Sequence, residues 1–180
     1  MKGLPKGKYK TILIDPPWPV TQHVPYEKMP LSKIIALPIN RLADKDAYVF
    51  LWTTNTMMQE AFGVLDAWKL KWVQTITWCK NYGLGRPPYT ATEHLLMARK
   101  GQPSRPHASV THATLANEQG VWLREKQILN WFQTHDKPKH SEKPQQSYDI
   151  IETLSPGPYL ELFARKPRTQ WAAWGNEVLS

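Results

Sequence analysis

Residues 11–18 of this chain read Thr-Ile-Leu-Ile-Asp-Pro-Pro-Trp, an apolar run that stops at an acid, two prolines and a large aromatic residue. The run before Asp15 is short and β-branched, which is typical of a buried parallel strand. Because Pro16 and Pro17 cannot donate hydrogen bonds to a neighbouring strand, the strand must end there and the chain must turn. Asp15 is therefore expected at the carboxyl edge of a sheet, where open α/β folds bind their ligands.

This turn has the groups needed to hold a flat nitrogenous base by its amino group. The exocyclic amine of adenine is a poor nucleophile because its lone pair is delocalised into the ring. If the Asp15 carboxylate and the Pro16 carbonyl accept its two protons, the lone pair is localised, and Trp18 can stack on the ring, a contact worth ~1–3 kcal/mol per base. A base in a duplex must first be flipped out. The alternative is an ordinary strand end followed by a proline turn.

Composition limits the classes of function. A chain of 180 residues predicts one domain over 1–180, and its net charge of +8 favours a polyanionic partner, although solvated cationic faces are also common. The single cysteine, Cys79, excludes an internal disulfide and a cysteine-rich zinc site, and it is expected in the core. The loop histidines lack an acidic cluster, so no metal is expected. Neither a signal peptide nor an apolar run near ~20 residues occurs, so we expect a cytoplasmic protein without a membrane partner.

Apolar strands alternate with amphipathic helices along the chain, which indicates an α/β fold with a doubly wound sheet. Residues 121–132 fit either a strand or a short helix, and residues 171–177 a short strand or a turn. Thr56 and Gln59 have the spacing of a capping box. Further strands are expected at 47–52, 72–79, 93–99 and 159–164, and helices at 32–37, 56–70 and 143–154.

Two polar stretches, 80–92 and 100–120, are expected to be loops that face nucleic acid. Long loops in a compact domain are usually functional or disordered. Their cations could contact phosphates, but each is as well explained as a solvated surface charge. The candidates, together with cations further along the chain, are Lys80, Arg86, Arg99, Lys100, Arg105, Arg124, Lys126, Lys137 and Lys139.

Several separate motifs follow one another in the order of one known family. They are Asp15-Pro16-Pro17-Trp18, Pro25-Tyr26, Phe50-Leu51-Trp52, Glu93-His94, Lys143-Pro144, Glu161-Leu162-Phe163-Ala164-Arg165 and Trp174-Gly175-Asn176. On these motifs almost the whole chain resembles the MT-A70-like family, that of the catalytic subunit of the eukaryotic mRNA adenosine methyltransferase and its bacterial and phage relatives. The resemblance implies methyl transfer from S-adenosylmethionine to the N6 amino group of adenine. It also implies a Rossmann-like methyltransferase fold, a mostly parallel sheet with helices on both faces.

The resemblance implies roles for individual residues. Asp15, Pro16, Pro17 and Trp18 would be catalytic, with Asp15 facing both the target amine and the amino group of the cofactor. The substrate side would be lined by Tyr26, Trp52 and Glu93, with Lys80 and Arg86 nearby. The cofactor would be bound by Lys143, which pairs with its carboxylate, and by Arg165, Asn176 and Glu177 at its ribose.

The chain also departs from the family pattern. Only ten residues precede Thr11, so the contact that the family makes to the cofactor adenine before the catalytic motif must come from elsewhere. After Arg165 the chain reads Lys166-Pro167-Arg168, where animal members place His and Asn contacts to the ribose. Its compactness and the lack of a separate recognition domain favour a bacterial or phage DNA enzyme, a monomer or homodimer. The alternatives are an RNA adenosine methyltransferase, a catalytically inactive nucleic-acid-binding subunit, and a general basic binding protein.

Overall fold

The computed structural model describes residues 3–20, 27–85, 87–104, 128–134, 142–176 and 178. Tyr26, Arg86 and Glu177 lie outside the described residues, as do residues 105–127, which include most of the predicted loop 100–120. No helix in the described part is long and apolar enough to cross a membrane. The elements are β1 (Tyr9–Ile14), α1 (Leu31–Ile35), α2 (Ile39–Leu42), β2 (Ala43–Thr54), the 3₁₀ helix η1 (Asn55–Met57), α3 (Met58–Ala67), β3 (Lys71–Leu84), β4 (Thr90–Lys100), β5 (Trp131–Thr134), α4 (Gln145–Leu154), β6 (Tyr159–Leu162) and β7 (Trp171–Trp174).

The strands form one seven-stranded sheet in the order β5-β3-β4-β2-β1-β6-β7. Four of its pairings are parallel, and β4 runs antiparallel between β2 and β3. The predicted mostly parallel α/β fold is therefore confirmed, with one departure. β4 lies between β2 and β3, the two strands that flank α3 in the chain, because it follows β3 directly and pairs antiparallel with both.

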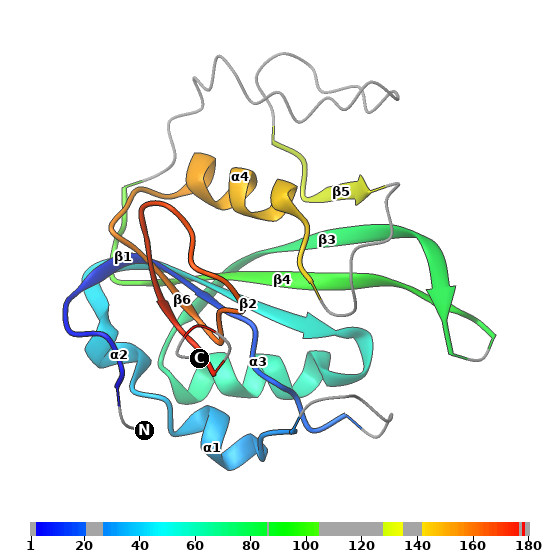
Figure 1. Cartoon of the computed structure of the whole chain (residues 1–180), viewed down its shortest axis with the longest axis horizontal. Helices are drawn as coiled ribbons and strands as arrows, with labels where there is room; N and C mark the ends of the chain where they lie inside the picture. The colour runs from blue at the N-terminus through cyan, green and yellow to red at the C-terminus, as the bar shows by residue number, and fades with distance from the viewer. Residues whose placement is uncertain are drawn as a thin grey trace.

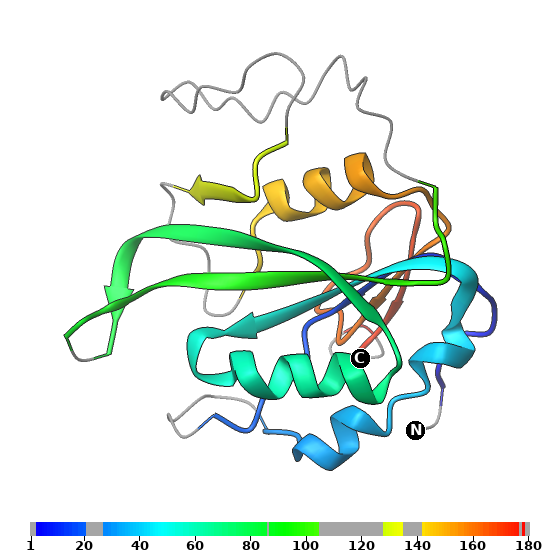
Figure 2. The ribbon, with the colours of Figure 1, turned by 180° about the vertical axis from the view of Figure 1, so that it is seen from behind.

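Helices cover both faces of the sheet (Figures 1 and 2). Ile12 and Ile14 of β1 pack into a cluster with residues of α1, α2 and α3. Leu13, which points the other way, packs into a second cluster with Tyr148 and Ile151 of α4. Each of the three β1 side chains is at most 1% exposed. The run before Asp15 is thus buried on both faces, as predicted for a central parallel strand.

Two local predictions were wrong. The expected capping box does not form: α3 begins at Met58 after η1, neither helix start has a side-chain cap, and Thr56 Oγ1 lies 3.1 Å from Thr54 Oγ1 instead. The stretch 80–92 is largely strand rather than loop, because β3 extends to Leu84 and β4 begins at Thr90. The resulting hairpin projects beyond the rest of the sheet (Figure 2).

One edge of the sheet gathers the predicted site residues. Ile14, the last residue of β1, is paired with Leu51 in β2 and Leu162 in β6, and the Asp15 amide donates to the Leu162 carbonyl at 3.4 Å. Because β4 is reversed, its beginning lies at this same edge, with Glu93 opposite Thr54 of β2. The antiparallel insertion therefore adds Glu93 to the carboxyl edge where Asp15 was predicted.

Candidate active site

The turn after β1 is held by backbone hydrogen bonds. The Trp18 amide donates to the Pro16 carbonyl, the Val20 amide to the Trp18 carbonyl and the Met29 amide to the Pro17 carbonyl, each at 2.8 Å. The Pro16 carbonyl thus already accepts one hydrogen bond, and its second lone pair can accept another. Asp15 stands at the start of this fixed turn, which limits where its carboxylate can lie.

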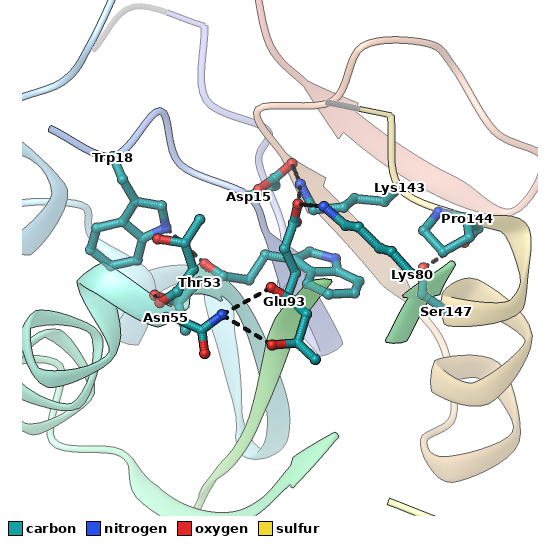
Figure 3. A network of polar contacts seen from close by, with 12 residues as sticks. Asp15, Trp18, Thr53, Asn55, Lys80, Glu93, Lys143, Pro144 and Ser147 are labelled. Carbon is teal, nitrogen blue, oxygen red and sulfur yellow. Dashed lines mark hydrogen bonds and ion pairs between the residues drawn. The ribbon is translucent and has the colours of Figure 1, made fainter. Parts of the chain in front are cut away.

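Trp18 does not present a free face, contrary to the stacking role expected from the sequence. Its side chain is 4% exposed and packs in the cluster of α1, α2 and α3. Its indole Nε1–H donates to the Trp52 carbonyl at 2.8 Å (Figure 3). A large apolar ring next to a helical layer gains more from burial than from exposure. In this structure Trp18 therefore anchors the turn to β2.

Four charged side chains of alternating sign meet beside the turn (Figure 3). Lys143 Nζ lies 2.7 Å from Asp15 Oδ2 and 3.5 Å from Glu93 Oε2, and Lys80 Nζ lies 2.5 Å from Glu93 Oε1. Their side chains are 9–24% exposed. The sequence pointed to all four separately, and the structure brings them into one cluster, in which Lys80 is paired with Glu93 rather than extended into solvent.

The pairing shapes the protonation of the cluster. Burial disfavours the charged form of Glu93, but the ammonium groups of Lys143 and Lys80 outweigh burial and lower the pKa of its carboxyl. Burial likewise acts against the charge of Lys143, but Asp15 and Glu93 outweigh burial and raise its pKa. At neutral pH Glu93 is therefore a carboxylate and Lys143 an ammonium ion.

Two tryptophans form the wall next to these charges. Trp52 and Trp78 are 1% and 2% exposed, with ring centroids 6.2 Å apart at 74°. Lys80 Nζ lies 4.6 Å from the ring centroid of Trp78, and Lys143 Nζ lies 5.3 Å from that of Trp52, within the range of cation–π attraction. Trp52 Nε1 is buried and has no hydrogen-bond partner among the described residues. An unmatched buried donor costs ~1–3 kcal/mol, so this N–H is suited to an acceptor on a bound ligand.

His94 borders the cluster and is held on both ring nitrogens. Its Nδ1 is 3.1 Å from Thr77 Oγ1 and its Nε2 is 3.0 Å from Asn55 Oδ1. Asn55 Nδ2 donates to the Thr92 carbonyl, so its Oδ1 is the acceptor that faces the imidazole. Burial lowers the pKa of His94, although the Glu93 charge acts in the opposite direction. His94 is therefore a fixed neutral neighbour of Glu93 at neutral pH.

Glu161 and Tyr148 form a buried pair for which no sequence motif indicated a role. Glu161 of β6 is 7% exposed and accepts a hydrogen bond from the Tyr148 hydroxyl of α4 at 2.8 Å. Burial raises the pKa of its carboxyl, and the Asp15 charge acts in the same direction, while the Tyr148 hydrogen bond and the Lys143 ammonium oppose it. The available signal was an acid alternating with leucines inside an apolar strand. Such an acid is buried and needs a partner.

Of the remaining predicted cofactor residues, Arg165 is close enough for its charge to act on Lys143 and lower its pKa. Arg165 and Asn176 follow β6 and β7 and are exposed, at the edge where Leu162 is paired with Trp174. Tyr26, Arg86 and Glu177 fall outside the described residues. Among the residues that the structure describes, no group of three or more His, Cys, Asp or Glu side chains could hold a metal ion. The individual roles of these residues stay predictions.

A family model, MT-A70, matches residues 9–177. The chain belongs to the MT-A70 family. This confirms the resemblance inferred from the separate motifs, and the seven-stranded sheet with helices on both faces is consistent with the Rossmann-like methyltransferase fold implied by it.

Relatives of this MT-A70 chain differ in length. The N(6)-adenosine-methyltransferase MT-A70-like protein of Drosophila melanogaster is 30% identical over 96% of this chain and 27% of its own length. The human N(6)-adenosine-methyltransferase catalytic subunit METTL3 is 29% identical over 96% of this chain and 28% of its own. The type II methyltransferase M.MunI of Mycoplasma sp is 24% identical over 97% of this chain and 80% of its own. The chain thus spans about a quarter of the first two relatives and most of M.MunI.

Proposed function

We propose that this MT-A70 chain transfers a methyl group from S-adenosylmethionine to the N6 amino group of adenine in nucleic acid, with DNA as the substrate. The observation that carries the proposal is the 2.7 Å ion pair between Asp15 and Lys143 at the carboxyl edge of the sheet. It sets one anion and one cation side by side, next to the unmatched donor of Trp52. This is the chemistry that an amino-acid zwitterion attached to a nucleoside requires.

The residues present fit this cofactor. Lys143 binds the carboxylate of its amino-acid group, and Asp15 accepts a hydrogen bond from the ammonium. The Glu93 carboxylate, 3.5 Å from Lys143 Nζ, keeps Lys143 protonated and in place while it exchanges Asp15 for the ligand, and Lys80 in turn holds Glu93. Arg165, Asn176 and Glu177 offer hydrogen bonds to the ribose hydroxyls. When bound, S-adenosylmethionine supplies an activated methyl group.

On the substrate side, Asp15 and the free lone pair of the Pro16 carbonyl accept the two amine protons of a flipped adenine. Holding both protons localises the nitrogen lone pair toward the methyl donor. Tyr26 and Glu93 line the base, and the buried Trp52, which the sequence also placed here, packs against Lys143 behind the charged cluster. Catalysis then depends on positioning and on fixed charges, without a covalent intermediate on the protein.

DNA is proposed over RNA on the comparison with relatives: the chain covers most of a relative named as a type II methyltransferase, and only about a quarter of the adenosine methyltransferases. The net charge of +8 suits the phosphate backbone of either nucleic acid, and we propose that the β3–β4 hairpin, Arg86 and the stretch 100–120 face it. We propose that residues 1–180 form one domain and that the chain is a monomer or a homodimer.

The test combines binding with product analysis. Calorimetric titration with S-adenosylmethionine should show binding, and methyl-labelled cofactor should mark adenine N6 in DNA oligonucleotides more than in matched RNA. Asp15→Asn, which keeps the shape but loses the charge, should lower the rate by at least about 100-fold, as loss of one preorganised acceptor does. The exposed Glu142→Gln serves as its control. Binding of nucleic acid without cofactor binding would make the chain an inactive subunit, and salt-sensitive binding indifferent to cofactor would make it a general basic binder.

A further inference from the structure

The connection between β6 and β7 is held in a fixed shape around Arg168. Arg168 forms a β-bridge with Trp171, whose amide donates to the Arg168 carbonyl at 3.2 Å. Gln170 between them has a φ of 66°, the left-handed conformation that closes the turn. The backbone of Arg168 is therefore positioned by its own turn. This basic segment stands where animal members of the family were expected to have ribose contacts.

From this turn the Arg168 side chain reaches across to α4. Its guanidinium carbon lies 3.5 Å from the centroid of the Tyr148 ring, and Nη1 donates to Gln145 Oε1 at 2.7 Å. Below, the Tyr148 hydroxyl is tied to the buried Glu161. Trp171 meets the same ring edge-on at 5.7 Å. The first turn of α4 is thus bound to the β6–β7 connection through Arg168 and to β6 through Glu161.

Lys143 lies just before Pro144, the residue that precedes the first turn of α4 (Figure 3). Pro144, the N-cap residue of α4, follows it with φ fixed near −68°, and the Ser147 hydroxyl donates to the Pro144 carbonyl at 2.7 Å. These constraints leave little freedom between Gln145 and the Lys143 backbone. A small rotation of the first turn would therefore move the Lys143 ammonium, which lies 2.7 Å from Asp15 and 3.5 Å from Glu93.

We propose that Arg168 is a positioning residue for Lys143: it clamps the first turn of α4 through Tyr148 and Gln145 and thereby sets the affinity for the cofactor carboxylate. The inference rests on the proposed function, since it takes S-adenosylmethionine as the ligand of Lys143. Arg168 need not touch the cofactor, and its effect passes through Lys143 alone.

Lys166, on the same connection, provides a matched control. Its Nζ lies 2.7 Å from Glu142 Oε1, so it also reaches the segment before α4. This pair is 66% and 37% exposed, and exposed pairs of this kind contribute little. Removing Lys166 deletes a cation of the same loop without loosening the contact on Tyr148.

The experiment measures the dissociation constant of S-adenosylmethionine by calorimetry, and kcat and KM with a DNA substrate, for the full chain. Arg168→Ala should raise the Kd and KM for the cofactor about tenfold, the scale of losing a cation–π contact with a charged hydrogen bond. The kcat at saturating cofactor should change less than about twofold, because the interaction lost is one made in binding. Lys166→Ala should change the Kd less than about twofold.

Two further variants separate positioning from charge and from stability. Arg168→Lys keeps the charge but loses the planar group, so it should bind nearly as weakly as Arg168→Ala. In a Lys143→Ala background, Arg168→Ala should add no further loss, because the two changes act through one group. The inference is overturned if Arg168→Lys binds like the unaltered chain, if the loss persists in full without Lys143, or if Arg168→Ala lowers only the Tm. Failure of the unaltered chain to bind S-adenosylmethionine would overturn the proposed function itself, and this inference with it.

Discussion

Replacing Glu93 by glutamine tests the charged cluster without reference to any substrate. The substitution keeps the shape of the side chain but removes the carboxylate that lies 2.5 Å from Lys80 and 3.5 Å from Lys143. Lys143 retains Asp15, whereas Lys80 loses the acid with which it forms its 2.5 Å ion pair. Two largely buried ammonium groups then face an uncharged amide. We expect a substantial loss of stability.

The magnitude follows from burial. Removing one partner of a buried ion pair costs about 3–5 kcal/mol, and the remaining exposure of Glu93 and the second partner of Lys143 place this case near 3 kcal/mol. In a domain of this size each kcal/mol lowers the Tm by about 2–4 °C, so Glu93→Gln should lower it by about 6–12 °C. The exposed pair of Lys166 with Glu142 is worth less than ~1 kcal/mol, so Lys166→Gln should change the Tm by less than about 4 °C.

The contribution of Glu93 to the free energy of unfolding should depend on pH. The pKa of Glu93 is lowered in the folded protein from its ordinary value of 4.5. Its contribution to the free energy of unfolding is therefore fully present above pH 4.5 and is lost as the pH falls through the folded pKa. Thermal unfolding followed by circular dichroism at pH 7 and at lower pH should show the gap between wild type and Glu93→Gln closing in acid. Equal unfolding temperatures at pH 7 would refute the account of the cluster.

Three further predictions concern the frame of the site. Trp18→Phe removes the donor to the Trp52 carbonyl and should cost about 1 kcal/mol in urea unfolding; an unchanged midpoint would show that this bond does not anchor the turn. Gly175→Ala places a Cβ 2.2 Å from the Ala164 carbonyl oxygen, so it should cost about 1–3 kcal/mol or more, and full stability would contradict the close approach of Gly175, directly after β7, to Ala164. His94 has a lowered pKa, so its contribution to stability is complete above pH 6.5 and declines as the pH falls below it. The stability difference between wild type and His94→Gln should therefore shrink below pH 6.5, and a constant difference would count against a buried neutral imidazole.

Much of the frame could be predicted because its signals are local. Pro16 and Pro17 end β1 wherever the strand lies, and the β-branched run before them is buried on both faces. The helix expected at 143–154 forms as α4, with Pro144 at its N-cap. The capping box failed since the chain at Thr56 enters a 3₁₀ turn whose hydroxyl partner is Thr54. Hydroxyl spacing alone does not decide where a helix begins.

The sequence by itself determined that Asp15 stands at the end of a central strand, because apolar pattern and proline act within a few residues, and its ordered motifs carried the resemblance to the MT-A70 family. The tertiary structure alone decided which charges face one another. The antiparallel insertion of β4 joins Glu93 to Lys80, 13 residues apart, and the docking of α4 joins Lys143 to Asp15, 128 residues apart. The tertiary structure also places the Trp18 side chain in the core. The partner of a charge depends on strand order and helix packing, which no local pattern records.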